Sequence, residues 1–277
     1  MLKIKTILNE VFGHLQLIWT VARYNNKAAF QGHYLGIAWE ILDPVIQIGI
    51  SFFIFGAMRT RGDVQVGLGA NYVEVPFLAW MVVGKAAWIF MNRVTLTGAQ
   101  SVQKKMSLVS KMQFPMSILP AMTVASRLTS YAVLSIVAVI AAISVGFMPN
   151  IFWIQYIYYL FAMLIFIYFF ALLNSTLTIL FRDYIHILRP FMRFMMFFSG
   201  VIWRLGEMPR MPNWFARLMD LNPFSYIITG FRYTFFGQAF FWQHWETTIF
   251  FWLLVLLIAI IASHLHLKLR AKFIDLA

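Results

Sequence analysis

The chain alternates between long apolar runs and short segments that hold most of its charged residues. A helix that crosses a lipid bilayer needs about 20 mostly apolar residues. By that measure the pattern predicts an all-α integral membrane protein with six transmembrane helices. The expected spans cover residues 37–58, 75–91, 128–147, 152–181, a shorter fifth candidate at 194–203, and 247–267. Residues 146–150 form a short uncharged connection around Pro149, so the third and fourth spans are expected to form a tight hairpin.

Two of the expected spans contain basic residues. Lys85 lies inside the second span, where a charge would cost about 2.5 to 3.5 kcal/mol at the helix centre, so we expect it to face protein or water. In the fifth span, Arg193 and Arg204 leave only residues 194–203 free of charge. Either that span begins near Leu188 with Arg193 facing a wet interior, or the bilayer thins around it.

The first 33 residues are expected to form a separate, interfacial element. Between residues 4 and 24 apolar side chains recur at spacings of four and three, which is typical of an amphipathic helix that lies in the membrane interface. Trp19 would then sit at headgroup depth. The alternative is a helix that packs on a soluble partner. The apolar stripe consists of Ile4, Leu8, Val11, Leu15, Ile18 and Ala22, and residues 34–277 would form the transmembrane domain.

Two connecting segments are more than linkers. Residues 101–119 form a basic segment that ends in Phe114–Pro115, and we interpret it as a short helix that docks on a partner; the alternative is a solvated loop attracted to anionic headgroups. Residues 205–246 contain three prolines and many aromatic residues. We interpret them as re-entrant helices in the outer leaflet, and the alternative is an aromatic belt that lies flat on the membrane.

Composition and charge agree with a membrane protein. Of the 277 residues, 61% are apolar and 12% are charged, whereas a soluble domain has roughly half and a quarter. The net charge of +12 would point to nucleic acid in a soluble protein, but here the basic residues lie mostly in short connecting segments. With the N-terminus inside, twelve of the Lys and Arg residues counted outside the membrane interior fall on the cytoplasmic side and six on the opposite side. Since cytoplasmic segments carry the excess of positive charge, this predicts a plasma-membrane protein with both termini in the cytoplasm. The residues after Lys3 and Lys5 form no continuous signal-peptide core, so we expect the start to be retained.

Motifs for catalysis and cofactor binding are missing from the sequence. It has no cysteine, no H-E-x-x-H, no G-x-S-x-G and no G-x-x-x-x-G-K-[ST], so we expect no catalytic, metal or cofactor site and no ATPase loop. Ion-driven transport needs ionisable groups deep in the membrane, and the available Glu40, Asp43 and Asp183 lie near predicted span ends. Such transport, and a membrane-embedded transferase that uses Glu40 and Asp43, remain alternatives.

Four short motifs carry a family resemblance. In chain order they are Tyr34–Trp39 followed by Pro44, Phe114–Pro115 followed by Pro120, Arg182–Asp183 followed by Ile185 and Leu188, and Asn222–Pro223 followed by Arg232. With six spans, this order resembles the type-2 ATP-binding-cassette permeases that export polysaccharides, most closely those for wall teichoic acid, with O-antigen and capsule permeases as neighbours. The chain departs from these relatives at Met116–Ser117, where many carry charge, and at Gly200, where many carry proline.

The resemblance implies a homodimer on two separate ATPase subunits, which would hold ATP and Mg²⁺. The substrate would be a polyprenyl-diphosphate-linked polymer. ATP-driven closure would move the basic segment and the interfacial helix, so that the first and fifth spans part. The expected ATPase-coupling residues are Lys104, Lys105, Leu108, Lys111, Phe114 and Pro115. The expected interfacial or gate residues are Trp19, Arg23, Tyr24, Tyr34 and Trp39.

We expect the substrate path to combine cations, which favour a polymer that carries phosphates, with aromatic rings, on which sugars stack. For the aromatic residues, lipid contact and helix packing are equally good explanations. The expected path residues are Phe52, Arg59, Lys85, Phe191, Arg193, Phe194, Phe198, Trp203 and Arg204.

Overall fold

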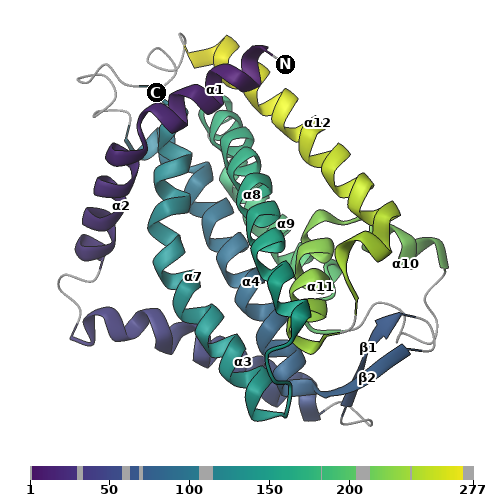
Figure 1. The fold of residues 1–277 in the computed structure, drawn as a ribbon. Helices are drawn as coiled ribbons and strands as arrows, with labels where there is room; N and C mark the ends of the chain where they lie inside the picture. Colours follow the sequence, from purple (N-terminus) through teal and green to yellow (C-terminus); the bar gives the residue numbers. More distant parts are fainter. Residues whose placement is uncertain are drawn as a thin grey trace.

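The computed structural model describes residues 2–29, 34–57, 63–68, 71–105, 115–181, 183–203, 213–237 and 239–270. Long helices dominate this part of the chain, and both ends of the chain lie at the same end of the molecule (Figure 1). The helices are α1 (Leu2–Gly13), α2 (Leu15–Ala29), α3 (Trp39–Ala57), α4 (Phe77–Ala99), α5 (Ser101–Lys104), α7 (Ile118–Ser144), α8 (Gln155–Leu180), α9 (Tyr184–Phe198), α10 (Asn213–Asp220), α11 (Pro223–Phe236) and α12 (Trp245–Leu269).

Four helical segments are long and apolar enough to cross a membrane: Phe77–Ala99, Ile118–Ser144, Ile151–Leu180 and Phe241–Leu269. They confirm the second, third, fourth and sixth predicted spans. On α12 the exposed residues Ile249, Leu253, Leu256 and Ile260 recur every three or four positions, which is the pattern of a helix with one face against lipid. The chain is therefore a multi-pass membrane protein.

The first and fifth predicted spans correspond to shorter helices. The apolar part of α3 is Leu42–Phe55, and α3 crosses the lower end of the bundle rather than running alongside α4, α7 and α8 (Figure 1). Helix α9 has 15 residues, about 22 Å at 1.5 Å per residue, whereas the hydrocarbon core is about 30 Å thick. That α3 and α9 cross the membrane stays a prediction.

Helix α4 is the centre of the bundle. It packs on α7 and α8 above all, and also on α11, α3 and α9. Its most apolar stretch is 83% buried, compared with 28% for α12. Lys85 lies on this helix with 4% of its surface exposed. The expectation that Lys85 faces protein or water rather than lipid is met by this burial.

The described part of the chain is predominantly helical, as expected, but a two-stranded antiparallel hairpin that the sequence analysis did not predict precedes α4. Strand β1 (Asp63–Leu68) pairs with β2 (Asn71–Pro76), and Val64 lies opposite Val75. Val64, Val66 and Val75 are buried while Glu74 is exposed, so the period-2 alternation of a half-buried strand explains the hairpin. The second span consequently begins at Phe77 instead of Val75.

The N-terminal region forms two helices where one was expected. Helix α1 ends at Gly13, and His14 forms a turn before α2, because glycine is a poor helix former. Ile18 and Ala22 of the predicted stripe are buried, but Leu15 is 51% exposed and the unpredicted Ile7 is buried. Helix α2 packs along α7, and α1 packs on α12. The stripe therefore faces the protein's own spans.

Helix α7 begins ten residues earlier than the predicted start of the third span at residue 128. Ile118 and Leu119, assigned to the basic connecting segment, are helical and fully buried. Ser126 lies inside the helix, and its hydroxyl donates a 2.7 Å hydrogen bond to the Met122 carbonyl oxygen. Polar residues that bond within the helix do not end it, so the helix extends through them.

The connections on the other side of the bundle agree with the sequence. The expected turn between the third and fourth spans is present, with Gly146 at φ +92° and the Asn150 side chain accepting a hydrogen bond from the Phe152 N–H. Helices α10 and α11 occupy much of the aromatic segment. Asn222 caps α11, Pro223 is its first residue, and Gly237 ends it at φ +68°. The depth of these two helices in the membrane stays a prediction.

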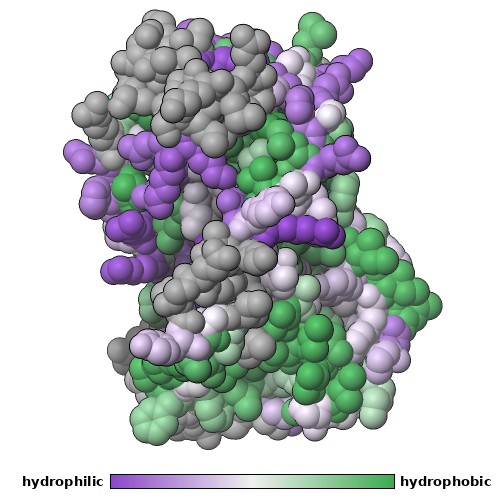
Figure 2. Space-filling view, turned by 90° about the vertical axis from the view of Figure 1, so that its left-hand side faces the viewer, coloured by the Kyte–Doolittle hydropathy of each residue, from purple (hydrophilic) through white to green (hydrophobic). Residues whose placement is uncertain are grey.

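Polar and apolar side chains separate along the length of the molecule. On the side shown in Figure 2, hydrophilic residues gather in the upper half, which contains the chain ends, and hydrophobic residues dominate the lower half. A surface with this division suits a membrane protein in which the upper part meets water or headgroups and much of the lower part contacts lipid.

Candidate functional site

The buried Arg232 joins three helices at one point. Its guanidinium donates from Nη1 to the Gly200 carbonyl oxygen at 2.7 Å and from Nη2 to the Val201 carbonyl oxygen at 2.9 Å. Its Nε donates to the Trp80 carbonyl oxygen at 3.3 Å. Residues 200 and 201 directly follow α9, so Arg232 ties the end of α9 to α4 and α11.

Helix α4 is shaped to receive this side chain. The Arg232 guanidinium carbon lies 3.3 Å from the centroid of the Trp80 ring, an arrangement in which the ring face attracts the cation. Gly84, one turn further along α4, leaves the space that Arg232 occupies, since a Cβ there would lie 2.2 Å from Arg232 Nη2. Only 4% of Arg232 is exposed. Arg232 therefore holds α4, α11 and the end of α9 together. The sequence analysis named this residue only as part of the fourth motif.

The expected path residues on α9 lie on the exposed face of this helix. Phe191 and Phe194 are exposed, whereas Ile185, Leu188 and Met192 pack inward. Arg193 is exposed too, and the Phe194 ring stacks on Phe198 with centroids 5.4 Å apart. A row of aromatic rings and a cation thus faces away from the bundle of this subunit.

Residues of α3 lie beside the end of α9. Trp203 packs edge-on against Phe55 with a centroid distance of 5.4 Å, and its Nε1 donates to the Phe197 carbonyl oxygen at 3.1 Å. Phe52, another expected path residue, is exposed and stacks on Phe77 at 6.4 Å. The structure therefore brings the path residue Trp203 against an aromatic residue of α3. Lys85 is buried within the bundle, and Arg59 and Arg204 lie outside the described residues.

The expected coupling residues are described only in part. Lys104 is exposed at the end of α5, and Lys105 follows it, partly buried. Removal from water lowers the pKa of Lys105 below its usual value. Pro115 is half-buried, and its carbonyl oxygen accepts a hydrogen bond from the Ile118 N–H that opens α7. Leu108, Lys111 and Phe114 lie outside the described residues.

The expected interfacial residues are exposed, as their assignment requires. Trp19, Tyr24, Tyr34 and Trp39 all present large aromatic surfaces to the surroundings. On α2 the Arg23 guanidinium carbon lies 5.6 Å from the centroid of the Trp19 ring. These residues form no single cluster with the α9 aromatics in any described contact, so the structure leaves their shared role as a gate a prediction.

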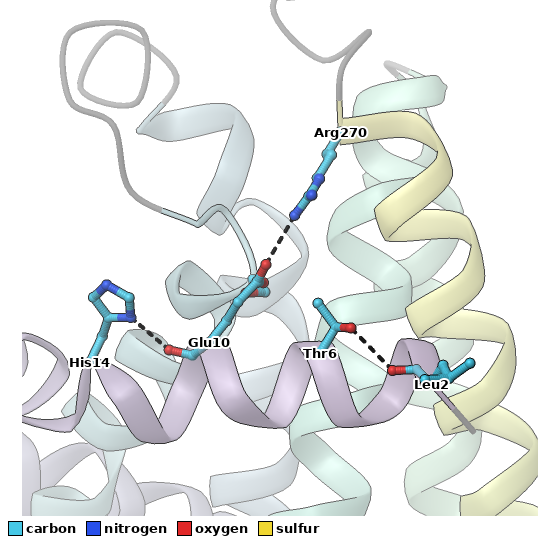
Figure 3. Close-up of polar contacts among 6 residues, drawn as sticks. Leu2, Thr6, Glu10, His14 and Arg270 are labelled. Carbon is cyan, nitrogen blue, oxygen red and sulfur yellow. Dashed lines mark hydrogen bonds and ion pairs between the residues drawn. The ribbon is translucent and has the colours of Figure 1, made fainter.

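A carboxylate that the sequence did not single out connects the two ends of the chain. Glu10 on α1 accepts a 2.9 Å hydrogen bond from Arg270 Nη1 at the end of α12 (Figure 3) and a second from the Ser117 hydroxyl at the start of α7. On the same helix, Lys3 Nζ lies 3.1 Å from His264 Nδ1 of α12. The N-terminal helix is thus bonded to both the last span and the end of the basic segment.

A second overlooked residue is Arg93 on α4. It forms an ion pair with Asp43 of α3, which also accepts a 3.1 Å hydrogen bond from Gln47 Nε2. Asp43 is thereby engaged within the subunit, which leaves little support for a catalytic carboxylate pair with Glu40. Within the described ranges, no group of three or more histidine, aspartate or glutamate residues is placed to hold a metal ion.

Comparison with known proteins gives these features a context. The sequence profile of the ABC-2 type transporter family matches residues 16–236. The O-antigen export system permease protein RfbA of Myxococcus xanthus is 21% identical over 238 residues, which is 86% of this chain and 85% of that protein. The protein of the same name from Klebsiella pneumoniae is 18% identical over 277 residues, 99% of each chain.

Proposed function

The chain belongs to the ABC-2 type transporter family, and from this premise we propose that it is the transmembrane subunit of an ATP-driven exporter of a lipid-linked polysaccharide. The observation that carries the proposal is the extent of the similarity, since two O-antigen export permeases align with 86% and 99% of the chain. The four apolar spans agree with that role.

The energy source is a separate ATP-binding-cassette subunit. The sequence has no G-x-x-x-x-G-K-[ST] loop of its own. Two copies of the ATPase would serve two copies of this chain, and the exposed apolar residues of α3 and α9, such as Phe53, Phe191 and Phe194, offer the surface for a homodimer. Exposed apolar patches of this kind mark either lipid or a protein partner.

Coupling to the ATPase would run through the end of the molecule that contains both termini. The basic segment starts at α5 and ends at Ser117, whose hydroxyl bonds to Glu10. A push on this segment would therefore act on α7 directly and on α1 and α12 through Glu10 and Arg270. This arrangement supports the segment around Lys104, Lys105 and Pro115 as the contact for the ATPase.

The polymer would pass along the exposed face of α9 and the adjacent part of α3. Aromatic rings at Phe52, Phe191 and Phe194 provide stacking surfaces for sugar rings, and Arg193 provides positive charge for the phosphates of the carrier. Because these residues face outward from one subunit, two copies would enclose the path between them.

Two polymers are worth testing. The motifs resemble those of wall teichoic acid permeases, and a polyprenyl-diphosphate-linked wall teichoic acid is the more specific form of the proposal. The two relatives are named for O-antigen export, which favours a polymer of the O-antigen type. A direct transport assay separates these substrates.

The test is ATP-dependent transport in reconstituted vesicles. The chain is purified with the ATPase encoded beside it, and lipid-linked teichoic acid and O-antigen polymers are supplied on one side. We expect one polymer to stimulate ATP hydrolysis and to appear on the other side, while a Walker-motif variant of the ATPase does neither. Transport without the ATPase, or a complex that hydrolyses ATP but moves no polysaccharide, would refute the proposal.

A further inference from the structure

A cavity of about 280 Å³ lies between α8, α10, α11 and the start of α12. These elements gather on the side of the molecule away from the chain ends (Figure 1), where the predicted orientation places the outer membrane surface. Pockets for drug-sized ligands measure roughly 300–1,000 Å³. The cavity is therefore large enough for one small ring compound and too small for a polymer chain.

The cavity combines apolar surface, which is the larger share of its lining, with polar groups from most of its lining residues. Eight of its nine lining residues carry one, including three tyrosines, the Asp220 carboxylate and the hydroxyl of Thr229. Among the described residues, no lysine, arginine or aliphatic side chain contributes to the lining. An acyl chain would leave the Asp220 carboxylate and the Thr229 hydroxyl facing hydrocarbon, and a phosphate would need cations rather than a carboxylate. The lining suits an uncharged molecule that carries several hydroxyl groups.

The walls of the cavity are held in place by hydrogen bonds from outside it. The Tyr226 hydroxyl lies 2.9 Å from the Tyr158 hydroxyl and 3.0 Å from Thr248 Oγ1. Trp252 Nε1 donates to the same Tyr158 hydroxyl at 2.9 Å. The Tyr159 ring lies directly against Gly230, and a Cβ atom added at residue 230 would be 2.0 Å from that ring. Such a fixed arrangement lowers the entropic cost of binding a ligand.

One lining residue has an unused hydrogen-bonding atom. His244 Nε2 is shielded from solvent and has no hydrogen-bond partner within the described part of the chain. Its ring is fixed by stacking on Tyr233, with centroids 4.9 Å apart and an angle of 7° between the planes. A buried polar atom without a partner is costly. Because Nε2 is shielded even from water, His244 contributes the other atoms of its ring to the lining of the cavity.

We propose that the cavity binds one uncharged pyranose residue of the exported polymer at the outer side of the subunit. The sugar hydroxyls would bond to Asp220 and Thr229, and its apolar face would contact the tyrosine rings. The identification of the sugar as part of the polymer rests on the proposed export function, whereas the binding of a free sugar does not.

The first test measures binding of free sugars to the full transporter complex. D-Glucose, D-galactose, D-mannose, L-rhamnose and N-acetyl-D-glucosamine are supplied one at a time to the complex in nanodiscs, with glycerol 3-phosphate as an anionic probe, and saturation-transfer NMR detects contact. We expect at least one sugar to give a signal that Asp220→Asn and Tyr233→Phe reduce at least threefold. Asp183→Asn and Tyr156→Phe, matched changes outside the cavity, should leave it unchanged.

A second test uses the absence of cysteine from the chain. The thiol introduced by Thr229→Cys would react with a methanethiosulfonate reagent, and the bound sugar should slow that reaction at least threefold; the thiol introduced by Ser144→Cys should show no protection. Absence of sugar binding to the wild-type complex, equal binding by the cavity variants, or binding of glycerol 3-phosphate alone would overturn the inference. Export without sugar binding would refute this site only, and binding without export would refute the proposed function only.

Discussion

Arg232 Nη1 donates a 2.7 Å hydrogen bond to the carbonyl oxygen of Gly200, although the two residues are 32 positions apart in the sequence. Gly200 lies in the turn that ends α9 and has a φ of +64°, a conformation that favours glycine. The turn therefore presents its carbonyl group to a guanidinium that α4 and α11 hold from the other side. The end of the shortest predicted span depends on this one side chain.

Replacing Arg232 should destabilise the fold even when positive charge is kept. In Arg232→Lys, one ammonium group replaces the planar donor set that reaches three carbonyl oxygens. An unsatisfied buried acceptor costs about 1–3 kcal/mol, so the unfolding temperature in detergent should fall by about 5 °C or more. Arg217→Lys, at an exposed position on α10, is the control. Equal unfolding temperatures for the two variants would contradict the structural role of Arg232.

Gly84→Ala should produce a related loss from the opposite side of the contact. The added Cβ would lie 2.2 Å from Arg232 Nη2, so the guanidinium would have to leave its carbonyl partners. We expect a fall in the unfolding temperature and no additional effect when Gly84→Ala is combined with Arg232→Lys, because both changes remove the same contact. Gly49→Ala adds a methyl group where no neighbour lies within 4 Å and should have little effect. Additive losses in the double variant would count against the shared mechanism.

Glu10→Gln should weaken coupling more than stability. The pair with Arg270 is partly exposed, with 48% of the arginine and 17% of the glutamate side chain accessible, and pairs of this kind contribute about 0–1 kcal/mol. The variant should therefore unfold within about 3 °C of the wild type. If α1 transmits motion between α7 and α12, the amount of polymer exported per ATP should fall at least twofold. Glu74→Gln, at an exposed position of β2, should keep the wild-type ratio of polymer exported to ATP hydrolysed.

The ion pair between Asp43 and Arg93 should show an energetic coupling between α3 and α4. Stability is measured for Asp43→Asn, Arg93→Met and the double variant. Because both side chains are partly exposed, we expect a coupling energy of about 1 kcal/mol or less, with the double variant more stable than the sum of the single changes predicts. Arg93 and Asp183 form the matched control, and their changes should be additive. Additivity for Asp43 as well would show that the pair does not fix α3.

Asp220 should make stability depend on pH in the acidic range. Partial removal from water raises the pKa of this carboxyl group above its ordinary value of 3.8. Between the ordinary and the raised pKa the folded protein binds more protons than the unfolded chain, so stability falls as pH rises through that window and is then constant. Asp220→Asn should remove this part of the pH dependence in thermal unfolding. Asp183→Asn should leave it in place.

Hydropathy predicted the long spans well because each is a continuous apolar run. Its errors have physical causes. The valines of residues 64–75 alternate in the manner of a strand, but the apolar run that starts at Val75 continues into α4, so the strand and the helix looked like one span. The predicted third span starts ten residues after α7 does, because Ser126 and Arg127 interrupt the apolar run. Inside the helix, the Ser126 hydroxyl is satisfied by the Met122 carbonyl oxygen.

The site could be predicted only as a set of residue types. Phe191 and Phe194 were expected because they are aromatic residues of the fifth predicted span; the structure shows them exposed on α9, and their role in the path stays a prediction. Glu10 and Arg93 were missed because their partners lie 260 and 50 positions away, respectively. No local pattern distinguishes them from other isolated charges near apolar runs. For Arg232, the sequence marked the residue but could not show that its side chain lies between α4 and the end of α9.

The central position of α4 has a consequence for biosynthesis. Of the four long apolar segments it has the lowest mean hydropathy, and most of its surface is covered by other helices. Among these, α7, α8, α9 and α11 are synthesised after it. The nascent α4, with Lys85 at its middle, must therefore wait in the insertion machinery, or enter lipid at a cost, until later segments arrive to shield it. Truncated nascent chains that stop before α7 should accordingly release α4 from the membrane.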